Sequence, residues 1–346
     1  MTLVDILIIA PGTDPDQYYA TGLALHSPFI TLVRGKKKVI AAGGFEYGQA
    51  KRKHPDTVRF ETLGKTFAEI VKAFCKKYRV LKPLMPASTR ADIYKLVPGA
   101  QLSGNVFPQR AVKSAQEIRH IRLAQKGTEQ AILSVREALQ DATVRKGKVF
   151  LGAKPLNSEH LKTLAAQELA KFDCTCPDMI ISSGWQSALP HHTGAGQLRE
   201  GAVIVDIFPQ SASSRYFADC TRTFVVGTPP KTFSERFEAV LAVQKKAIAN
   251  IKHGVIGPEQ SARAQFTELG FATDFARGTG YIHSLGHGVG LEIHEDPRLR
   301  ERLVAGNVVT VEPGLYYDYG IRLEDIGVVT KKGFTNFTKL KRDPYL

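Results

Sequence analysis

Four apolar, strand-like segments decide the fold, and each carries at least one acidic residue: AVIVDIF (202–208), YFADCTRTFVV (216–226), VVTVEPGLYY (308–317) and IRLEDIGVVT (321–330). The acids, in that order, are Asp206, Asp219, Glu312 and Glu324. They fall into two pairs whose members are 13 and 12 residues apart. Two strand pairs with acids at matching places predict two related halves of one domain.

Helical patterns precede each strand pair. Apolar residues recur at helical spacing over about 114–141 and 157–171 before the first pair, and over about 231–252 and 258–270 before the second. Each half therefore reads helix, helix, strand, strand. We predict an α+β domain with pseudo-twofold symmetry, whose functional site lies between the two halves.

The first ~105 residues follow a different pattern. Short β-rich runs bounded by Gly, Pro and Asp alternate with a helical run over residues 66–77, which predicts a small α/β domain. The stretch SGNVFPQRAVK (103–113) combines turn residues with a proline and is typical of a linker. We therefore expect two domains, residues 1–105 and 106–346.

Composition excludes several classes of protein. The chain has 346 residues, of which 43% are hydrophobic and 23% charged, as is typical of a globular protein rather than a disordered one. No run approaches the ~20 apolar residues that a membrane-spanning helix needs, so no membrane partner is expected. The four cysteines show neither zinc-ribbon nor redox spacing, which favours reduced thiols and a cytoplasmic location.

Basic residues are concentrated near the start of the chain. The net charge is +14, and residues 51–105 contain 12 Lys and Arg against 4 Asp and Glu. Such a surface could attract nucleic acid, but aromatic residues are scarcely interleaved with these charges. We interpret it as a solvated basic face and expect no nucleic-acid partner.

The four acids require an explanation, because an unpaired charge inside a protein is costly. Strand alternation places Asp219 on the same face as Thr221. It likewise places Arg322 on the same face as Glu324. Carboxylates gathered in this way either share protons, pair with cations such as Arg222 and Arg322, or bind metal.

A histidine-rich segment favours metal. HSLGHGVGLEIHE (283–295) supplies His283, His287 and His294, with three glycines that let the backbone pass close to other groups. Its spacing matches neither the dinucleotide-binding fingerprint nor the H-E-x-x-H zinc motif. One histidine with four carboxylates is an oxygen-rich set that favours Mn²⁺, Fe²⁺ or Co²⁺ over structural zinc. Bridging carboxylates could hold two such ions ~3.5–4 Å apart, the separation used for hydrolysis.

These motifs resemble the five-ligand signature of the pita-bread metallopeptidases, which include prolidase (Xaa-Pro dipeptidase), aminopeptidase P and methionine aminopeptidase. The signature covers residues 106–330 and consists of Asp206, Asp219 in FADCTRTF, His287 in GHGVGLEIHE, Glu312 in VEPGLY and Glu324 in IRLED. The size of the first 105 residues, with the segment DPDQYYATG (14–22), resembles the creatinase-like N-terminal domain of the prolidase and aminopeptidase P branch. The resemblance implies a C-terminal pita-bread fold, a curved antiparallel sheet covered by helices, preceded by a smaller α/β domain.

The resemblance also implies the metal ligands. Two divalent ions would be held by Asp206, Asp219, His287, Glu312 and Glu324. Asp219 and Glu324 would bridge both ions, and Glu312 would also take a proton from the bridging water. Arg322 and Thr221 would support the ligands from behind, with Arg322 holding a bridging carboxylate.

Residues on the substrate side follow from the same resemblance. His191 and His294 would be catalytic and substrate-binding residues that contact the substrate carbonyl and the tetrahedral intermediate. Arg298 falls where prolidases place an arginine that binds the free carboxylate of the dipeptide. The alternative is a solvated, arginine-rich loop that also contains Arg300 and Arg302.

Two features depart from the family pattern. The stretch from Asp206 to Asp219 is about two residues longer than usual, and Phe208 occupies a place where glycine is common. For His192 and His283 we expect packing or hydrogen bonding rather than metal binding.

The resemblance therefore implies a dinuclear-metal peptidase that hydrolyses Xaa-Pro dipeptides by attack of a metal-bridging hydroxide. The alternatives are an aminopeptidase P acting on longer Xaa-Pro peptides, a non-catalytic binding protein of the same fold, and a creatinase-like hydrolase of another amide. Mn²⁺ is the expected metal, with Co²⁺, Fe²⁺ or Zn²⁺ as alternatives. A homodimer is expected by analogy.

Overall fold

The computed structural model describes residues 4–346 and divides into two compact units, with the boundary between Pro108 and Gln109. This boundary lies inside the segment 103–113 that has the composition of a linker. Within residues 4–346, none of the helices combines the length and the apolar character that crossing a membrane requires. All four cysteines are free thiols.

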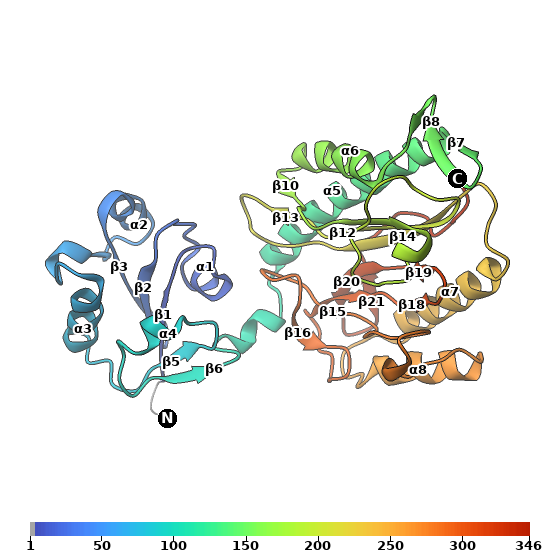
Figure 1. Ribbon diagram of the computed structural model, residues 1–346. Coiled ribbons are helices and arrows are strands. Elements are labelled where there is room, and N and C mark those ends of the chain that lie inside the picture. The colour runs from blue at the N-terminus through green and yellow to red at the C-terminus, as the bar shows by residue number, and fades with distance from the viewer. Residues whose placement is uncertain (1–3) are drawn as a thin grey trace. The chain divides into compact units, whose positions relative to one another are not determined.

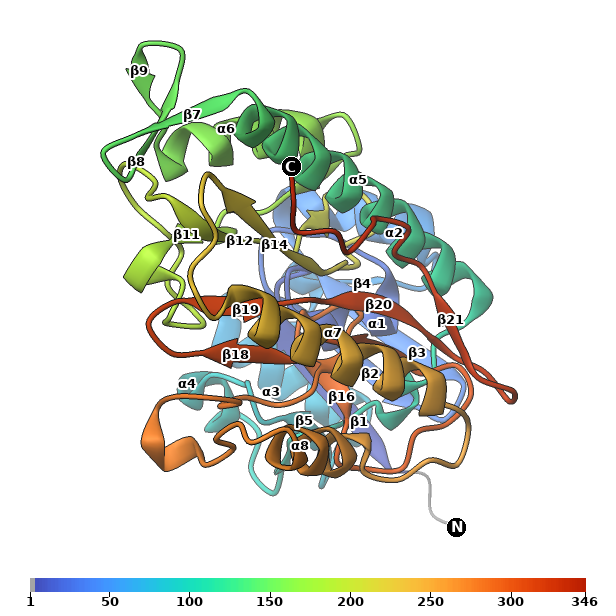
Figure 2. The same ribbon diagram turned by 90° about the vertical axis from the view of Figure 1, so that its right-hand side faces the viewer.

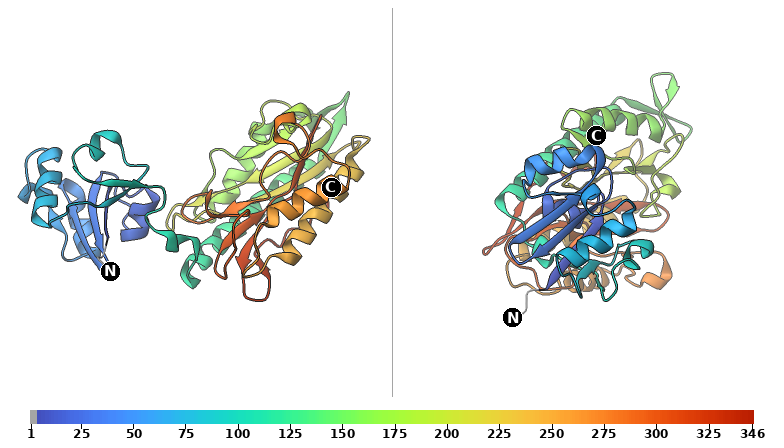
Figure 3. Two further views of the ribbon diagram at one scale, coloured as in Figure 1. Left: turned by 90° about the horizontal axis from the view of Figure 1, so that it is seen from below. Right: turned by 90° about the vertical axis from the view of Figure 1, so that its left-hand side faces the viewer.

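The first unit contains a six-stranded sheet with the order β4-β3-β2-β1-β5-β6 (Figure 1, Figure 3). Its elements are β1 (Asp5–Ala10), α1 (Pro15–Thr21), β2 (Phe29–Arg34), β3 (Lys37–Ala42), η1 (Gly44–Glu46), α2 (Tyr47–Lys53), β4 (Val58–Arg59), η2 (Phe60–Thr62), α3 (Phe67–Lys77), β5 (Leu84–Pro86), α4 (Ala91–Tyr94) and β6 (Gln101–Ser103). The pairs β1–β2 and β2–β3 are antiparallel, and the other pairs are parallel. Helix α3 begins at a capping box formed by Thr66 and Glu69, and it buries Val71 and Phe74 against the sheet core.

The basic residues of the first unit lie on its surface. Lys51, Arg52 and Lys53 are exposed in the last turn of α2, and Lys72 and Lys76 are exposed on α3. A lysine or arginine on an exposed helix face keeps its hydration, so these charges need no partner. The structure thus agrees with a solvated basic face.

The second unit begins with two helices and a group of antiparallel strands. Its first half consists of η3 (Pro108–Ala111), which spans the boundary, α5 (Ala115–Gln140), β7 (Ala142–Arg145), β8 (Lys148–Leu151), β9 (Lys154–Pro155), α6 (Ser158–Ala170), β10 (Cys174–Thr175), β11 (Ile180–Ser183), η4 (Gly184–Gln186), β12 (Gly201–Ile207), β13 (Gln210–Ser211) and β14 (Cys220–Val226). Strands β11, β12 and β14 form an antiparallel sheet in that order. Strands β7–β9, which the sequence patterns did not predict, form a separate sheet between the two helices in the chain.

The second half repeats this order. Its elements are α7 (Phe233–Asn250), α8 (Pro258–Glu268), η5 (Phe275–Arg277), β15 (His287–Gly288), β16 (Glu295–Arg298), β17 (Val308–Val311), β18 (Gly314–Tyr316), β19 (Gly320–Arg322), β20 (Asp325–Val329) and β21 (Phe334–Asn336). The four long helices begin and end within three residues of the predicted ranges. In Figure 2, α5 runs above β12 and β14, while α7 is seen across β18 and β19. Helix α5 contacts β12 and β14, and helix α7 contacts β17, β18 and β19.

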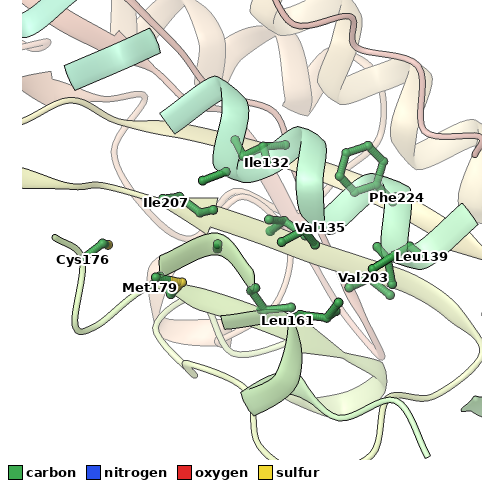
Figure 4. Packing of buried hydrophobic residues seen from close by; sticks show 14 of the residues in the cluster. Ile132, Val135, Leu139, Leu161, Cys176, Met179, Val203, Ile207 and Phe224 are labelled. Carbon is green, nitrogen blue, oxygen red and sulfur yellow. The ribbon is translucent and has the colours of Figure 1, made fainter. Parts of the chain in front are cut away.

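Each half has its own apolar core. In the first half, Ile132 and Val135 of α5 pack with Val203 and Ile207 of β12 and with Leu161 of α6 (Figure 4). A second cluster joins side chains of α7 and α8 to those of β17, β18 and β19. Burial on both faces holds the antiparallel strands rigidly, which gives the functional side chains a fixed scaffold.

The two acidic strands of the second half are interrupted, which corrects the prediction of continuous strands. Glu312 and Pro313 separate β17 from β18, while Leu323 and Glu324 separate β19 from β20. The two breaks lie opposite each other, since Val311 pairs with Asp325 and Gly314 pairs with Arg322. Proline has no N–H to donate to a ladder, which explains why pairing stops there.

Candidate metal centre

Acidic and histidine side chains from both halves converge on one point. One ligand atom from each of Asp219, His287 and Glu324 lies within 4.8 Å of the others. The His287 Nε2 atom also lies 3.3 Å from Glu312 Oε1 and 3.5 Å from Asp219 Oδ2. Three of the four predicted acids thus gather around one predicted histidine.

The strand breaks free two backbone N–H groups that hold the glutamates in place. The N–H of Glu312 donates to the carbonyl of Leu285 at 2.7 Å. The N–H of Glu324 donates to the carbonyl of Thr221 at 3.0 Å, which joins the second half to the first. Because neither glutamate lies within a regular strand, these bonds, rather than the sheet ladder, fix where the carboxylates point.

His287 is oriented by its neighbours. Its backbone N–H donates to Thr310 Oγ1 at 3.1 Å, and its ring Nδ1 atom lies 3.2 Å from the carbonyl oxygen of Gly288. A proton on Nδ1 satisfies that carbonyl and leaves the Nε2 lone pair facing the carboxylates. Gly286 is required here, since a Cβ atom at this position would lie 2.3 Å from the Thr310 carbonyl oxygen.

Burial perturbs the acid–base properties of this cluster. Burial, reinforced by neighbouring carboxylates, raises the pKa of Asp219 and of Glu312 well above their ordinary values. The same causes raise the pKa of Glu324 to about 7. Burial, together with the nearby His294, lowers the pKa of His287 to about 3, so its imidazole is neutral at neutral pH.

The donor set fits a divalent cation. Within the part of the chain that the structure describes, three buried carboxylate oxygens have no hydrogen-bond partner: Oδ1 of Asp206, Oδ1 of Asp219 and Oε1 of Glu324. Leaving such atoms unpaired is costly, and a cation among them removes both the desolvation cost and the mutual repulsion. A neutral imidazole facing carboxylates completes an oxygen-rich site for a transition metal.

Arg322 supports the site, but through a different carboxylate from the one predicted. Its guanidinium contacts Asp206 Oδ2 at 2.5 Å, not Asp219 or Glu324. It reaches Glu324 only through Thr221, whose hydroxyl accepts from Arg322 Nε at 3.2 Å and donates to Glu324 Oε2 at 2.8 Å. The side chains of Arg322 and Glu324 thus meet at the Thr221 hydroxyl, although the strand is broken between the two residues.

Arg222, the other arginine considered as a partner of the acids, points elsewhere. Its guanidinium forms an ion pair with Asp325 at 2.9 Å and contacts none of the four acidic side chains. The interpretation that it neutralises the acids is therefore wrong.

The sequence reasoning missed Tyr316, a fully buried residue behind Arg322. Its hydroxyl accepts from Arg322 Nη1 at 2.7 Å and lies 3.1 Å from His283 Nε2. His283 thus has the hydrogen-bonding role expected of it. Gly314 makes room for this contact, since a Cβ atom there would lie 2.7 Å from the Tyr316 hydroxyl oxygen. The only signal in the sequence was a tyrosine two residues from a conspicuous glycine.

The histidines expected on the substrate side are more exposed than the ligands. The ring of His294 meets the ring of His287 edge to face, with centroids 4.3 Å apart. Burial and the charges of His191 and Arg298 lower the pKa of His294, which places both residues within electrostatic reach of it. His192 has a structural contact instead, because its Nδ1 accepts from the N–H of Gly194 at 3.0 Å.

The arginine-rich stretch separates into residues with different surroundings. Arg298 is exposed and lies opposite His287 in the pairing of β15 with β16. Arg302 turns away to donate to the carbonyl of Gly254 at 3.1 Å. Of the two, Arg298 is the one that is adjacent to the candidate site.

The longer stretch between Asp206 and Asp219 forms an ordered turn. Strand β13 in this turn pairs with β10, and Phe208 packs against the core of the first half. Asp206 and Asp219 nevertheless keep their places, because β12 and β14 pair in register, with Asp206 opposite Thr221.

Known proteins resemble this chain over nearly its whole length. The model of metallopeptidase family M24 matches residues 119–331. The Xaa-Pro dipeptidase of Pyrococcus horikoshii is 30% identical over 98% of this chain and 94% of its own length. That of Pyrococcus furiosus is 32% identical over 94% of this chain and 91% of its own length.

Solved structures agree. The crystal structure of the prolidase from Pyrococcus horikoshii superimposes with a TM-score of 0.81 at 26% identity, covering 99% of this chain and 95% of its own. The X-Pro aminopeptidase from Thermotoga maritima has a TM-score of 0.80 at 25% identity, and the match covers 99% of this chain and 98% of the Thermotoga chain. The α+β fold class and the resemblance to the pita-bread metallopeptidases are thereby confirmed. The chain belongs to metallopeptidase family M24, and it is a metal-dependent peptidase.

Proposed function

We propose that this metallopeptidase hydrolyses the bond before proline, with Xaa-Pro dipeptides as its main substrates. The observation that carries the proposal is the convergence of Asp219, His287 and Glu324 beside buried carboxylate oxygens that have no protein partner. Support for the substrate class comes from the relatives named Xaa-Pro dipeptidase, which share 30% and 32% identity with almost the whole chain.

The five expected ligands, Asp206, Asp219, His287, Glu312 and Glu324, would hold two divalent ions. Bound ions of this kind lower the pKa of water and polarise a carbonyl oxygen, which is the chemistry that amide hydrolysis needs at neutral pH. Asp206, Asp219 and Glu324 are buried, so a bound cation would offset the cost of keeping their charges away from water.

Glu312 is the proposed general base. It lies beside His287 at 3.3 Å, and Thr310 Oγ1 is 3.4 Å from its Oε1 atom. Burial raises its pKa well above the ordinary value. From this position the carboxylate would accept a proton from the attacking water and return it to the leaving proline nitrogen.

His191 and His294 are proposed to bind the scissile carbonyl. Both are exposed at the edge of the ligand cluster, where a substrate can reach them. An imidazole N–H that donates to the developing oxyanion stabilises the transition state, a contribution of about 3–4 kcal/mol for one donor. Arg298, on the same side, is proposed to bind the free carboxylate of the dipeptide through two parallel hydrogen bonds.

Mn²⁺ is the proposed metal, because an oxygen-rich ligand set with one imidazole suits it, and Co²⁺, Fe²⁺ and Zn²⁺ are the alternatives. Assembly as a homodimer, a cytoplasmic location and the creatinase-like character of residues 1–105 stay predictions.

The test is hydrolysis of Ala-Pro and Met-Pro by the full chain after removal of metal with a chelator and addition of Mn²⁺ or Co²⁺. We expect activity that depends on the added metal. Absence of turnover by protein with metal shown to be bound, for example by elemental analysis, would contradict the proposal. A matched Ala-Ala substrate tests whether proline is required.

Aminopeptidase P activity is the second candidate, since an X-Pro aminopeptidase from Thermotoga maritima has the same fold. Peptide length separates the two activities. We expect Arg298→Ala to raise the KM for Gly-Pro by about 10-fold or more and to leave a longer Xaa-Pro-Yaa peptide unaffected. Arg302→Ala is the matched control, because Arg302 binds Gly254 instead. Equal KM values for wild type and Arg298→Ala would refute the role of Arg298.

A further inference from the structure

Arg222 is a fully buried arginine whose bonding capacity is completely used. It lies in β14 directly after Thr221, so its side chain points to the opposite face of the strand. Its Nε donates to the carbonyl of Lys341 at 2.9 Å, and Nη1 donates to the carbonyls of Thr221 at 2.9 Å and Glu324 at 2.7 Å. Nη2 donates to Asp325 Oδ1 and to the carbonyl of Leu340, both at 2.9 Å. A guanidinium has five N–H donors, and here each one has an oxygen acceptor.

Glu324 is held at three points by two consecutive residues of the first half. Thr221 accepts from its N–H at 3.0 Å and donates to its carboxylate at 2.8 Å. Arg222 donates to its carbonyl at 2.7 Å. Because Glu324 lies between β19 and β20, outside both strands, these contacts replace a sheet ladder in fixing its peptide plane.

The same guanidinium anchors a segment at the end of the chain, residues 336–342, which we call the C-terminal clasp. Arg222 binds two of its carbonyls, and the carboxylate of Asp325 accepts from Asn336 at 2.6 Å and from Arg342. Glu129 of α5 accepts from the backbone of the clasp, and Thr338 accepts from Gln125 and from the N–H of Ile326. The clasp thus contacts both Arg222 and the two residues that directly follow Glu324.

We propose that Arg222 is a positioning residue for the metal centre and that the C-terminal clasp holds Arg222 in the orientation that this role requires. The inference rests on the proposed function only in assigning Glu324 as a metal ligand. If the Glu324 carbonyl loses the Arg222 donor, it keeps only the weak S–H donor of Cys220 at 3.3 Å, so the peptide can rotate and carry the carboxylate out of line with Asp219 and His287. Loss of such a supporting bond typically weakens metal binding by about 10–100-fold.

Coupling of this kind is reciprocal. If the clasp favours the geometry of Glu324 that binds metal, then metal at Glu324 must stabilise the clasp by the same free energy. The wild-type protein can therefore test the inference without any substitution.

The first experiment is hydrogen–deuterium exchange on the full wild-type chain, chelator-treated and then loaded with Mn²⁺. We expect Mn²⁺ to slow exchange in residues 336–342 by about 10-fold. The hairpin of β7 and β8, residues 142–151, is the internal control, since none of its bonds leads to the metal centre. Equal protection of the clasp and the hairpin, or none at all, would overturn the inference.

The second experiment compares two arginine variants by calorimetric titration with Mn²⁺. Arg222→Lys keeps the positive charge but has one nitrogen in place of three. We expect the affinity for Mn²⁺ to fall by about 10-fold or more at one of the metal sites that Glu324 would help to form. Arg34→Lys is the matched control, because Arg34 forms a two-bond ion pair with Asp5 of the first unit and lies outside the clasp. We expect it to keep wild-type affinity and the wild-type visible spectrum of bound Co²⁺, whereas Arg222→Lys changes that spectrum.

The outcomes are distinguishable. A folded Arg222→Lys with unchanged affinity and spectrum would overturn the inference, and if this variant does not fold, the exchange experiment decides. A protein that binds Mn²⁺ and shows the coupling but leaves Ala-Pro intact contradicts the proposed substrate while supporting the role of Arg222. A protein that cleaves Ala-Pro but shows no coupling refutes only the role of Arg222.

Discussion

Thr221 offers the sharpest test of how the metal centre is supported. Its hydroxyl is completely buried and serves two charged groups at once, donating to Glu324 Oε2 at 2.8 Å and accepting from Arg322 Nε at 3.2 Å. Thr221→Val removes this hydroxyl with little change in side-chain volume. The substitution therefore changes hydrogen bonding and leaves the packing of β14 in place.

The expected effect follows from the two bonds. A hydrogen bond to a charged group contributes about 1.5–3 kcal/mol, and the loss of both leaves a carboxylate and a guanidinium partly unsatisfied. We expect the free energy of unfolding of the metal-free protein to fall by roughly 3–6 kcal/mol. Glu324 also loses the bond that orients its carboxylate, so we expect Mn²⁺ affinity to fall by about 10–100-fold.

Thr223→Val is the matched control. Thr223 lies on the same face of β14, is equally buried, and also makes two hydrogen bonds, but both join the backbone of Arg322, at 2.9 and 3.0 Å. We expect this variant to be destabilised without a comparable loss of metal affinity. Urea unfolding gives the stability of both variants, and calorimetric titration of chelator-treated protein gives their affinity for Mn²⁺.

The comparison has a clear negative result. If Thr221→Val and Thr223→Val lower Mn²⁺ affinity equally, then Thr221 acts only through general stability, and the reasoning about Glu324 is wrong.

Three further predictions concern stability. Tyr316→Phe removes the acceptor that lies 2.7 Å from Arg322 Nη1 and leaves this nitrogen only a longer contact of 3.3 Å to the Pro190 carbonyl, so we expect a loss of about 1–3 kcal/mol in urea unfolding. Gly320→Ala places a Cβ atom 2.0 Å from the Ser187 carbonyl oxygen, so we expect at least about 1–3 kcal/mol of destabilisation in the same assay. In the metal-free protein, folded Glu324 keeps its proton up to a pKa of about 7, whereas the unfolded chain releases it near 4.5. Wild type should therefore lose about 3 kcal/mol of stability relative to Glu324→Gln as the pH rises from 4.5 to 7, measured by urea unfolding at each pH.

Each of these has its own control. Tyr317→Phe removes a hydroxyl that makes only a long bond of 3.4 Å to Ala272, so it should cost less than Tyr316→Phe. Gly333→Ala adds a methyl group in open space and should be neutral. For Glu324, added Mn²⁺ should displace the proton and abolish the pH dependence of the stability difference between wild type and Glu324→Gln. If wild type instead gained stability relative to Glu324→Gln as the pH rises, the sign of the argument would be wrong.

The sequence was sufficient for the elements whose signal is local. The helices α5, α6, α7 and α8 have apolar periodicity and begin near capping residues or prolines, so their ranges were predicted closely. The convergence of Asp219, His287 and Glu324 was foreseen from their residue types and from the family resemblance. The roles assigned to individual ligands and substrate-binding residues stay predictions.

What the sequence could not provide was contact between distant segments. The support that Thr221 gives to Glu324, and the partnership of Arg322 with Asp206, depend on how two hairpins meet in space. Strand alternation could not reveal these pairs, because the breaks beside Glu312 and Glu324 interrupt the period on which it relies. Tyr316 was missed for the same reason, since its partners come from other segments.

The ordered turn between β12 and β14 has a consequence for recognising relatives. The places of Asp206 and Asp219 are set by the pairing of those two strands, so the number of residues between them is free to vary. An insertion in this turn is tolerated, whereas a single-residue deletion inside β14 would exchange the directions of Thr221 and Arg222 and direct a guanidinium at the ligands. Search patterns that demand a fixed gap between the two aspartates will therefore overlook relatives with functional metal centres. For the same reason, a foreign peptide inserted into this protein belongs in the turn rather than in the strand.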